Sequence, residues 1–175
     1  TWNAPTGGHM MWTRSSDDGA TWTTPRDLPQ IPHAYAPGLI MQHSDGTMYA
    51  AALIQSGHFW ASNLPSNPVD FLRCMDANFP EQMAILRSDD LGESWQEVGR
   101  TSGPFLSRLE HPCSITEGTD GSLLMLIDGH AAPAADSQWI NALLHSTDRG
   151  ETWQTRSIFG DEERDVEEGH LVRLA

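Results

Sequence analysis

The sequence Ser146-Thr147-Asp148-Arg149-Gly150-Glu151-Thr152-Trp153 follows the pattern Ser-x-Asp-x-Gly-x-Thr/Ser-Trp, which occurs three times in this chain. The other two copies are residues 15–22 and 88–95. We call the three copies, in chain order, box 1, box 2 and box 3. Three copies with five constrained positions each are very improbable by chance in 175 residues. An internal repeat indicates an architecture built of repeated structural units, so it decides the fold before any other signal.

Each box is predicted to form a tight turn between two strands. Gly supplies a positive φ, and the Asp and Ser/Thr side chains hydrogen-bond to nearby backbone amides. The apolar stretches before the boxes, residues 9–12, 83–86 and 140–144, are strand-like. The Trp opens the next strand, where it can pack between sheets. This structural role is assigned to Asp17, Gly19, Trp22, Asp90, Gly92, Trp95, Asp148, Gly150 and Trp153.

A second pattern repeats out of phase with the boxes. A short apolar run, an Asp-Gly pair and a longer apolar run follow one another in residues 37–53 and again in 112–127, and the pattern begins once more at 169. The box aspartates, at positions 17, 90 and 148, are 73 and 58 residues apart, and the run starts at 37, 112 and 169 are 75 and 57 apart. The two measures agree, so the repeating unit contains about four strands.

An all-β fold follows, because four antiparallel strands per unit is the composition of a β-propeller blade. The predicted units are residues 1–30 (the second half of a blade), 31–101 (a full blade with a long insertion within 55–82), 102–160 (a full blade) and 161–175 (the first strand of the next blade). A propeller must close on itself to protect its edge strands. We therefore expect a fragment of a larger protein, an expectation that the start at Thr1 without Met and the end within the pattern also favour.

Composition excludes several classes of partner. The formal net charge is −14, from 10 Lys and Arg against 24 Asp and Glu, and such a surface repels nucleic acid. No apolar run approaches the length of a membrane helix. Eight histidines are scattered without a metal-ligand spacing, so neither a metal site nor another cofactor is predicted. Cys74 and Cys113 are compatible with one disulfide or with two buried thiols.

Boxes of this form, with hydrophobic strands ending at Asp-Gly between them, resemble those of the sialidase (neuraminidase) superfamily, also called BNR-repeat or Asp-box proteins. The resemblance covers essentially the whole chain. It implies a six-bladed propeller whose enzymes remove terminal sialic acid from glycans with retention of configuration. It also implies that the boxes lie at the blade periphery as folding clips, so Asp17, Asp90 and Asp148 are expected to be structural. The implied active site contains three arginines, an aspartate acid/base and a tyrosine nucleophile paired with a glutamate.

The resemblance places catalytic residues at the starts of inner strands. Glu168 precedes such a start, in a sequence similar to the family's Glu-Pro-x-hydrophobic-Val pattern, and Glu110 is the second candidate for the same role. Asp128 is the candidate acid/base, since partial burial there could raise its pKa. The alternatives are a solvated carboxylate at a strand end for Glu168 and Glu110, and a turn cap for Asp128.

Tyr35, His111 and Trp60 are weaker candidates for contacts with a sugar, Trp60 as part of an aromatic platform. Gln30-Ile31-Pro32 stands where the family usually has Arg-Ile-Pro. Neither complete unit shows a triad arginine, and the arginines that flank the boxes (Arg87, Arg149 and Arg156) are expected at the surface. The missing arginines would then belong to other blades, or the substrate is not sialic acid.

The sequence therefore predicts a sialidase-like glycoside hydrolase that acts on a glycan or oligosaccharide and is completed by the remaining propeller blades. Because a fold does not fix a function, two alternatives remain. One is a non-catalytic carbohydrate-binding or adhesion propeller. The other is a polysaccharide lyase on a similar propeller, with Tyr or His as its base.

Overall fold

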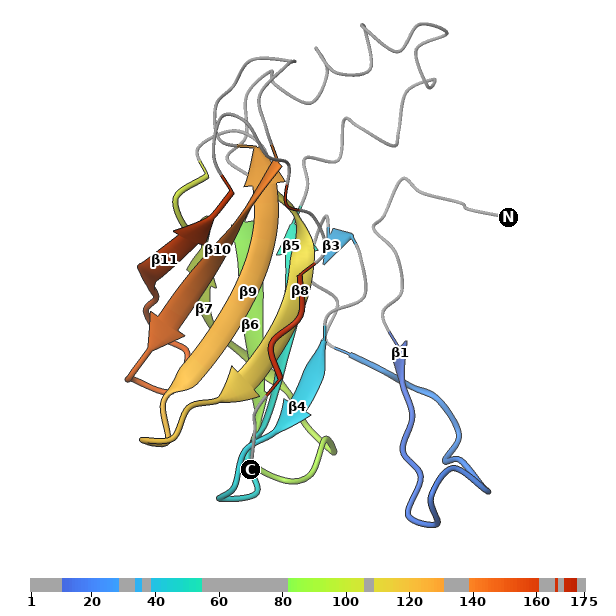
Figure 1. The fold of residues 1–175 in the computed structure, drawn as a ribbon. Helices are drawn as coiled ribbons and strands as arrows, with labels where there is room; N and C mark the ends of the chain where they lie inside the picture. The colour runs from blue at the N-terminus through green and yellow to red at the C-terminus, as the bar shows by residue number, and fades with distance from the viewer. Residues whose placement is uncertain are drawn as a thin grey trace, which may run out of the picture.

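The computed structural model describes residues 11–28, 34–35, 39–54, 82–105, 109–130, 139–160, 166 and 169–172. These residues form strands and turns, without a helix, and so none of them belongs to a helix that could span a membrane (Figure 1). The strands are β1 (Met11–Trp12), β2 (Arg26–Asp27), β3 (Ala34–Tyr35), β4 (Ile40–Gln42), β5 (Met48–Ile54), β6 (Gln82–Ser88), β7 (Gln96–Thr101), β8 (Leu109–Glu117), β9 (Leu123–His130), β10 (Trp139–Ser146) and β11 (Gln154–Phe159). The all-β prediction is confirmed.

Every strand pairing is antiparallel, and the strands form three sheets. β1 and β2 make the first hairpin. The middle sheet has the order β3-β5-β6-β7, with β4 also paired to β5, and the C-terminal sheet has the order β11-β10-β9-β8. The strands predicted before the boxes are present as β1, β6 and β10.

The edge of the middle sheet differs from the prediction. We expected Tyr35 just before a single inner strand, but it lies in β3, opposite Leu53. β4 pairs with the N-terminal half of β5. Ile40 lies opposite Ala50, and Gln42 lies opposite Met48. Between the pairings of β3 and of β4 the edge advances five residues, from Tyr35 to Ile40, while β5 advances three, from Leu53 to Ala50, so the register along this edge is irregular.

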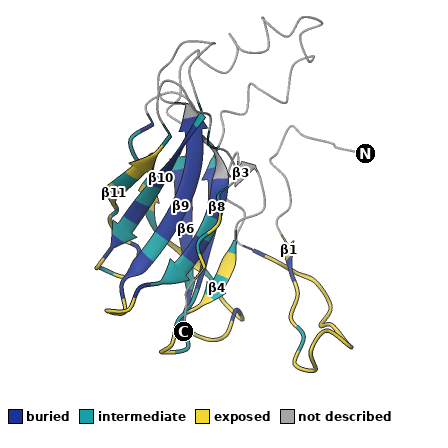
Figure 2. Cartoon of the chain, in the orientation of Figure 1, coloured by how far each residue is buried: buried dark blue, intermediate teal, exposed yellow. Residues whose placement is uncertain are grey.

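Alternation along β5 divides the middle sheet into two apolar faces. Tyr49, Ala51 and Leu53 face the C-terminal sheet and pack in one buried cluster with side chains such as Met125 and Leu144. Ala50 belongs to a second cluster on the opposite face. That cluster is completed by Trp12, Leu28, Ala84 and Leu86. Figure 2 shows the buried residues concentrated along β6, β8 and β9. The three sheets therefore stack face to face.

The three boxes share one set of hydrogen bonds. In box 3, Asp148 Oδ1 accepts from Ser146 Oγ at 2.8 Å and from Thr152 N at 2.9 Å. Gly150 N donates to Ser146 Oγ at 2.9 Å, and Trp153 Nε1 donates to Gly150 O at 3.1 Å. Boxes 1 and 2 repeat these bonds. The predicted hairpins held by Asp, Ser/Thr and Gly are confirmed.

The sequence predicted positive φ at the glycine of each turn. The residue before that glycine has positive φ as well. In box 2 these are Leu91 at 58° and Gly92 at 87°, which are the φ values of a type I′ turn. Asp18 and Arg149 take the position of Leu91 in the other two boxes, at 56° and 62°. A left-handed conformation costs a non-glycine residue roughly 1–2 kcal/mol. The network of side-chain hydrogen bonds therefore imposes the turn on whatever residue stands before the glycine.

The boxes also bring neighbouring sheets into contact. Gly99 on β7 lies directly under box 3, where a Cβ at residue 99 would approach Glu151 O to 2.6 Å and Gly150 O more closely still. Box 2 meets the first hairpin in the same way, since its Trp95 packs edge-on against Trp12 with ring centroids 6.3 Å apart. Trp153 packs on the cluster between the middle and C-terminal sheets. Trp22 of box 1, by contrast, is 62% exposed.

Gly99→Ala should destabilise the protein by about 2 kcal/mol, because the added methyl group meets backbone oxygens that cannot rotate away. The matched control is Gly46→Ala, which has positive φ but no atom within 4 Å of the added carbon. Its cost should be only the roughly 1 kcal/mol of the left-handed conformation. Urea denaturation of both variants gives the comparison. Equal losses would contradict the close approach of β7 to box 3.

The box carboxylates should make stability depend on pH below about 4. Hydrogen bonds from the Ser94 hydroxyl, then from Ser94 N and the Ser88 hydroxyl, lower the pKa of Asp90 from 3.8 to about 2. Because the folded pKa lies below the unfolded one, this stabilisation is complete above about pH 4 and is lost as pH falls towards about 2. Asp90→Asn should flatten the fall in unfolding free energy across that window. Asp18→Asn, at the tip of box 1, is the control, and an equal change in both variants would contradict the assignment.

Candidate functional site

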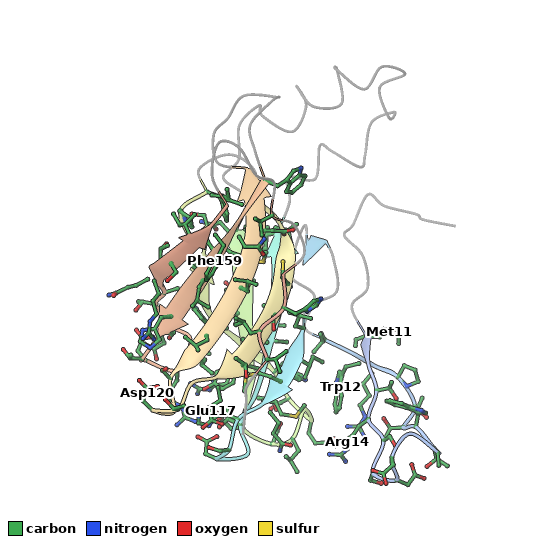
Figure 3. The ribbon with its side chains drawn as sticks, viewed as in Figure 1. Met11, Trp12, Arg14, Glu117, Asp120 and Phe159 are labelled. Atoms are coloured by element: carbon green, nitrogen blue, oxygen red, sulfur yellow. The ribbon has the colours of Figure 1, made fainter. Side chains whose placement is uncertain are left out.

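The two ends of the C-terminal sheet have different chemistry. At one end, which we call the box end, the β8–β9 turn lies beside the boxes. Going from Leu123 to Asp128 along β9 takes five steps, or about 17 Å towards the other end. Glu117 and Asp120 mark the box end in Figure 3, while Phe159, whose register partner is Asn141, lies further along the sheet. Glu110, His111 and Asp128 all belong to the far end.

A row of polar residues crosses the sheet at the far end. Asp128 on β9 is the register partner of His111 on β8 and of Asn141 on β10. Because directly opposite residues place their side chains on the same face of a sheet, those of Asp128 and Asn141 share one face. The Asp128 and Asn141 side chains are each 1% exposed. Asp128 lies within β9 with a partner strand on each side, and not in a turn.

Glu110 occupies a break in the β8 ladder. Leu109 pairs with Gly129 and His111 with Asp128, so Glu110 is an extra residue, as in a β-bulge. A second irregularity follows between Pro112 and Ser114. Bulges bend a strand and are common next to active sites, where they redirect a side chain. The strand that carries two of the candidates is thus irregular where they lie.

Asn141 connects this row to the chain beyond β11. Its Nδ2 donates to Val166 O at 2.6 Å, and its Oδ1 accepts from Gly169 N at 3.3 Å. Val166 N in turn donates to Trp139 O at 3.0 Å. The two residues that flank the dipeptide 167–168 are therefore both bound to β10. Asn141 was not among the residues predicted from the sequence, although an amide within the apolar run Ile140 to Leu144 is a signal for such a role.

Several candidates are placed only in part. Glu168, Trp60 and Cys74 lie outside the described residues. The predicted insertion within 55–82 lies almost entirely outside them as well. Cys113 is buried in β8. The structure thus brings Glu110, His111 and Asp128 to one end of one sheet, while Tyr35 belongs to the middle sheet.

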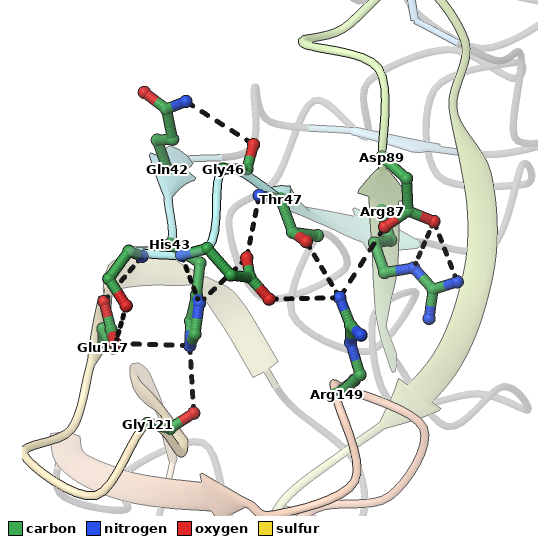
Figure 4. A network of polar contacts seen from close by, with 11 residues as sticks. Gln42, His43, Gly46, Thr47, Arg87, Asp89, Glu117, Gly121 and Arg149 are labelled. Atoms are coloured by element: carbon green, nitrogen blue, oxygen red, sulfur yellow. Dashed lines mark hydrogen bonds and ion pairs between the residues drawn. The ribbon is translucent and has the colours of Figure 1, made fainter.

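The box end carries a polar network that joins the middle and C-terminal sheets (Figure 4). Glu117 accepts from Ser44 N at 2.9 Å and from Ser44 Oγ at 2.6 Å. His43 Nε2 lies 3.0 Å from Gly121 O, which can only accept, so this nitrogen carries a proton. Glu117 Oε1 is 3.4 Å from the same nitrogen. Two turns from different sheets are held together in this way.

Arg149 of box 3 extends the network. Its guanidinium donates to Thr47 Oγ1 at 2.9 Å and to Asp45 Oδ2 at 3.3 Å. Hydrogen bonding with the Tyr49 side chain is the main cause that raises the pKa of Arg149, with smaller contributions from nearby carboxylates. A hydrogen bond from the Thr47 N–H and, second, one from the Thr47 hydroxyl lower the pKa of Asp45 from 3.8 to about 2. Asp45 and Arg149 are therefore charged partners across the sheet interface.

These groups leave little room for a ligand. The cavity between them is about 160 Å³, smaller than the roughly 300–1,000 Å³ typical of small-molecule sites. Within the described part of the chain, no three His, Cys, Asp or Glu side chains are grouped so that they could hold a metal ion. Two larger hollows lie elsewhere at the box end, one of about 420 Å³ beside box 2 and one of about 440 Å³ between the β8–β9 turn and Leu171. We assign the network of His43 and Arg149 to structure. The far end remains the candidate site because the sequence-predicted residues Glu110, His111 and Asp128 belong to it.

The model of the BNR repeat-like domain family matches residues 1–154. Among solved structures, the chain is similar to a Hadza microbial sialidase, Hz136, with a TM-score of 0.58 and 21% identity over 90% of this chain and 33% of that one. It is also similar to NanB in the structure with Optactamide, with a TM-score of 0.54 and 21% identity over 86% of this chain and 19% of that one. This chain thus spans a third or less of both structures. No curated protein matches the sequence.

Glu117→Ala should lower the unfolding free energy by about 2 kcal/mol, since it removes a charged acceptor that is 14% exposed and bonded to Ser44. It should leave any activity of the far end unchanged. Glu93→Ala is the matched control, because its inter-sheet contact with Arg26 is solvent-exposed and worth less than about 1 kcal/mol. Chemical denaturation measures the stability effect, and a turnover assay of the full-length protein measures the effect on activity. A loss of turnover in the folded Glu117→Ala protein would place function at the box end instead.

Proposed function

We propose that this chain, which belongs to the BNR repeat-like domain family, is part of a sialidase-like glycoside hydrolase that removes terminal sugars, foremost sialic acid, from glycans. The observation that carries the proposal is the asymmetry of the C-terminal sheet. At its box end, charged groups are bonded to partners across the sheet interface. Its far end combines a bulge at Glu110 with the buried side chains of Asp128 and Asn141, and Asn141 is bonded to Val166 and Gly169. Irregular, polar strand ends on a rigid sheet are suited to present catalytic groups.

The chain would form consecutive blades of a propeller. The middle and C-terminal sheets would be two complete blades, corresponding to residues 31–101 and 102–160. The first hairpin would be the outer half of a preceding blade. Residues 161–175 would begin the next one. The face-to-face stacking of the sheets supports this arrangement. So do Trp22, 62% exposed, and Val172, 78% exposed, which further blades would cover.

Glu168 and Glu110 are the residues we propose to act nearest the sugar. A carboxylate there would take a proton from a neighbouring tyrosine nucleophile or return it, while a second acid protonates the departing glycosidic oxygen. Asp128 was our candidate for that acid, but its burial keeps it from a substrate in this arrangement. We therefore propose that Asp128 supports the site from beneath and that the acid and the tyrosine come from elsewhere in the full protein.

Recognition of an acidic sugar requires arginines that the described residues do not supply at the far end. Arg149 is bound to Thr47 and Asp45, and Arg87 is paired with Asp89 3.1 Å away, all at the box end. With a net charge of −14, the chain would repel a carboxylate substrate unless other blades provide a local positive cluster. Activity on sialosides should therefore depend on the full-length protein, and this chain alone should be inactive.

The test is release of a fluorophore from a sialoside by the full-length protein, with binding of the glycan measured separately. Glu168→Gln or Glu110→Gln should lower kcat at least about 100-fold with little change in glycan affinity. Glu97→Gln, on the outer strand β7, is the control and should retain activity. Glycan binding without turnover in the wild-type protein would indicate the non-catalytic alternative. An unsaturated sugar product would indicate a lyase.

A further inference from the structure

Asn141 is a buried amide in an otherwise apolar strand, and its position requires an explanation. Burying a carboxamide costs free energy unless both its donor and its acceptor find partners. Its neighbours along β10, Ile140 and Ala142, lie in the apolar cluster on the opposite face. On its own face, the polar atoms of Asn141 bond to Val166 O and Gly169 N, which are backbone groups of a segment more than twenty residues further along the chain.

The two bonds reach backbone groups of residues that are three apart in the sequence. The carbonyl of Val166 and the N–H of Gly169 bond to opposite ends of one carboxamide. A third bond, from Val166 N to Trp139 O at 3.0 Å, ties Val166 to β10 through its backbone as well. The segment is thus held at both ends by one strand.

Gly169 makes the close approach possible. A Cβ at this residue would lie 2.9 Å from Leu126 Cδ2 and 3.0 Å from Asn141 Oδ1. Any side chain at residue 169 would therefore push the segment away from the amide that binds it. The glycine, the amide and the buried Asp128 next to Asn141 form one contiguous arrangement across β9 and β10.

We propose that Asn141 is a positioning residue of the candidate site, because it holds Val166 and Gly169, the two residues that flank Glu167 and Glu168 in the sequence. Its effect on turnover rests on the proposed function, whereas its hold on the segment does not. Both the Nδ2 donor and the Oδ1 acceptor of the Asn141 carboxamide are required. An aspartate at residue 141 would keep the acceptor for Gly169 N but would set a carboxylate oxygen against Val166 O, and a leucine would keep the volume but neither bond.

The experiment compares Asn141→Asp and Asn141→Leu with a matched control in the full-length protein. The control is Leu144→Ala, on the same strand but in the apolar cluster, which lowers stability without touching the segment. The first readout is hydrogen exchange of the Gly169 amide, followed by NMR or mass spectrometry under native conditions. Asn141→Leu should accelerate this exchange about tenfold or more relative to neighbouring amides, and Leu144→Ala should not accelerate it selectively.

The second readout is the sialoside assay. Asn141→Asp should lower kcat about tenfold or more with little change in KM and should alter the pH profile of kcat, because it places a new carboxyl against Val166 O and Gly169 N. Leu144→Ala should leave kcat of the folded protein unchanged.

Unchanged Gly169 exchange in Asn141→Leu would overturn the proposed hold on the segment. The two claims can also separate. If Asn141→Leu loses Gly169 protection selectively but the wild-type protein turns over no sialoside, the hold on the segment is supported and only the proposed function is rejected. A normal kcat and pH profile in Asn141→Asp, despite wild-type turnover, would overturn the positioning role.

Discussion

The structure depends on one local interaction, the box carboxylate that accepts hydrogen bonds within its own turn. Asp148 Oδ1 binds the Ser146 hydroxyl before the turn and the Thr152 amide after it, so a single side chain fixes both ends of the hairpin. These bonds also impose positive φ on Leu91 and Arg149, which do not favour it. Once the turn is fixed, its carbonyls lie against Gly99 of the neighbouring sheet, and a local motif becomes a contact between sheets.

This use of the boxes separates structure from chemistry in space. Polar groups of the box end are already bonded: Glu117 to Ser44, and Arg149 to Asp45 and Thr47. A charge that is engaged in this way cannot also recognise a substrate without releasing its partner. The far end of the same strands is where a bulge at Glu110 interrupts the regular ladder. This chain has many acidic residues. Those bonded across the sheet interface, such as Glu117 and Asp45, are assigned to the scaffold and are not candidates for catalysis.

Local patterns were predictable from the sequence, and long-range ones were not. The box hairpins and the strands β5, β6, β9 and β10 depend on residues that are close in sequence, so spacing was sufficient to predict them. The irregular register of β3 and β4 against β5 and the bulge at Glu110 depend on pairing with a partner strand, which no single run of residues encodes. The role of Asn141 was hidden for the same reason, since its partners, Val166 and Gly169, lie outside its own strand. The burial of Asp128 likewise depends on tertiary packing.

A polar residue towards each end of β10, Asn141 at one and Ser146 at the other, fixes the register of this strand against β9. Ser146 faces Leu123 and must reach Asp148, while Asn141 faces Asp128 and must reach the segment beyond β11. These residues are five apart, so they lie on opposite faces of the strand. If β10 slipped by one residue against β9, both side chains would change faces. Asn141 would be buried in the apolar cluster, and Ser146 would lose its place beside the turn. A buried amide that costs stability can therefore also specify register. The strand that is fixed by a box at one end delivers a defined geometry to the candidate site at the other.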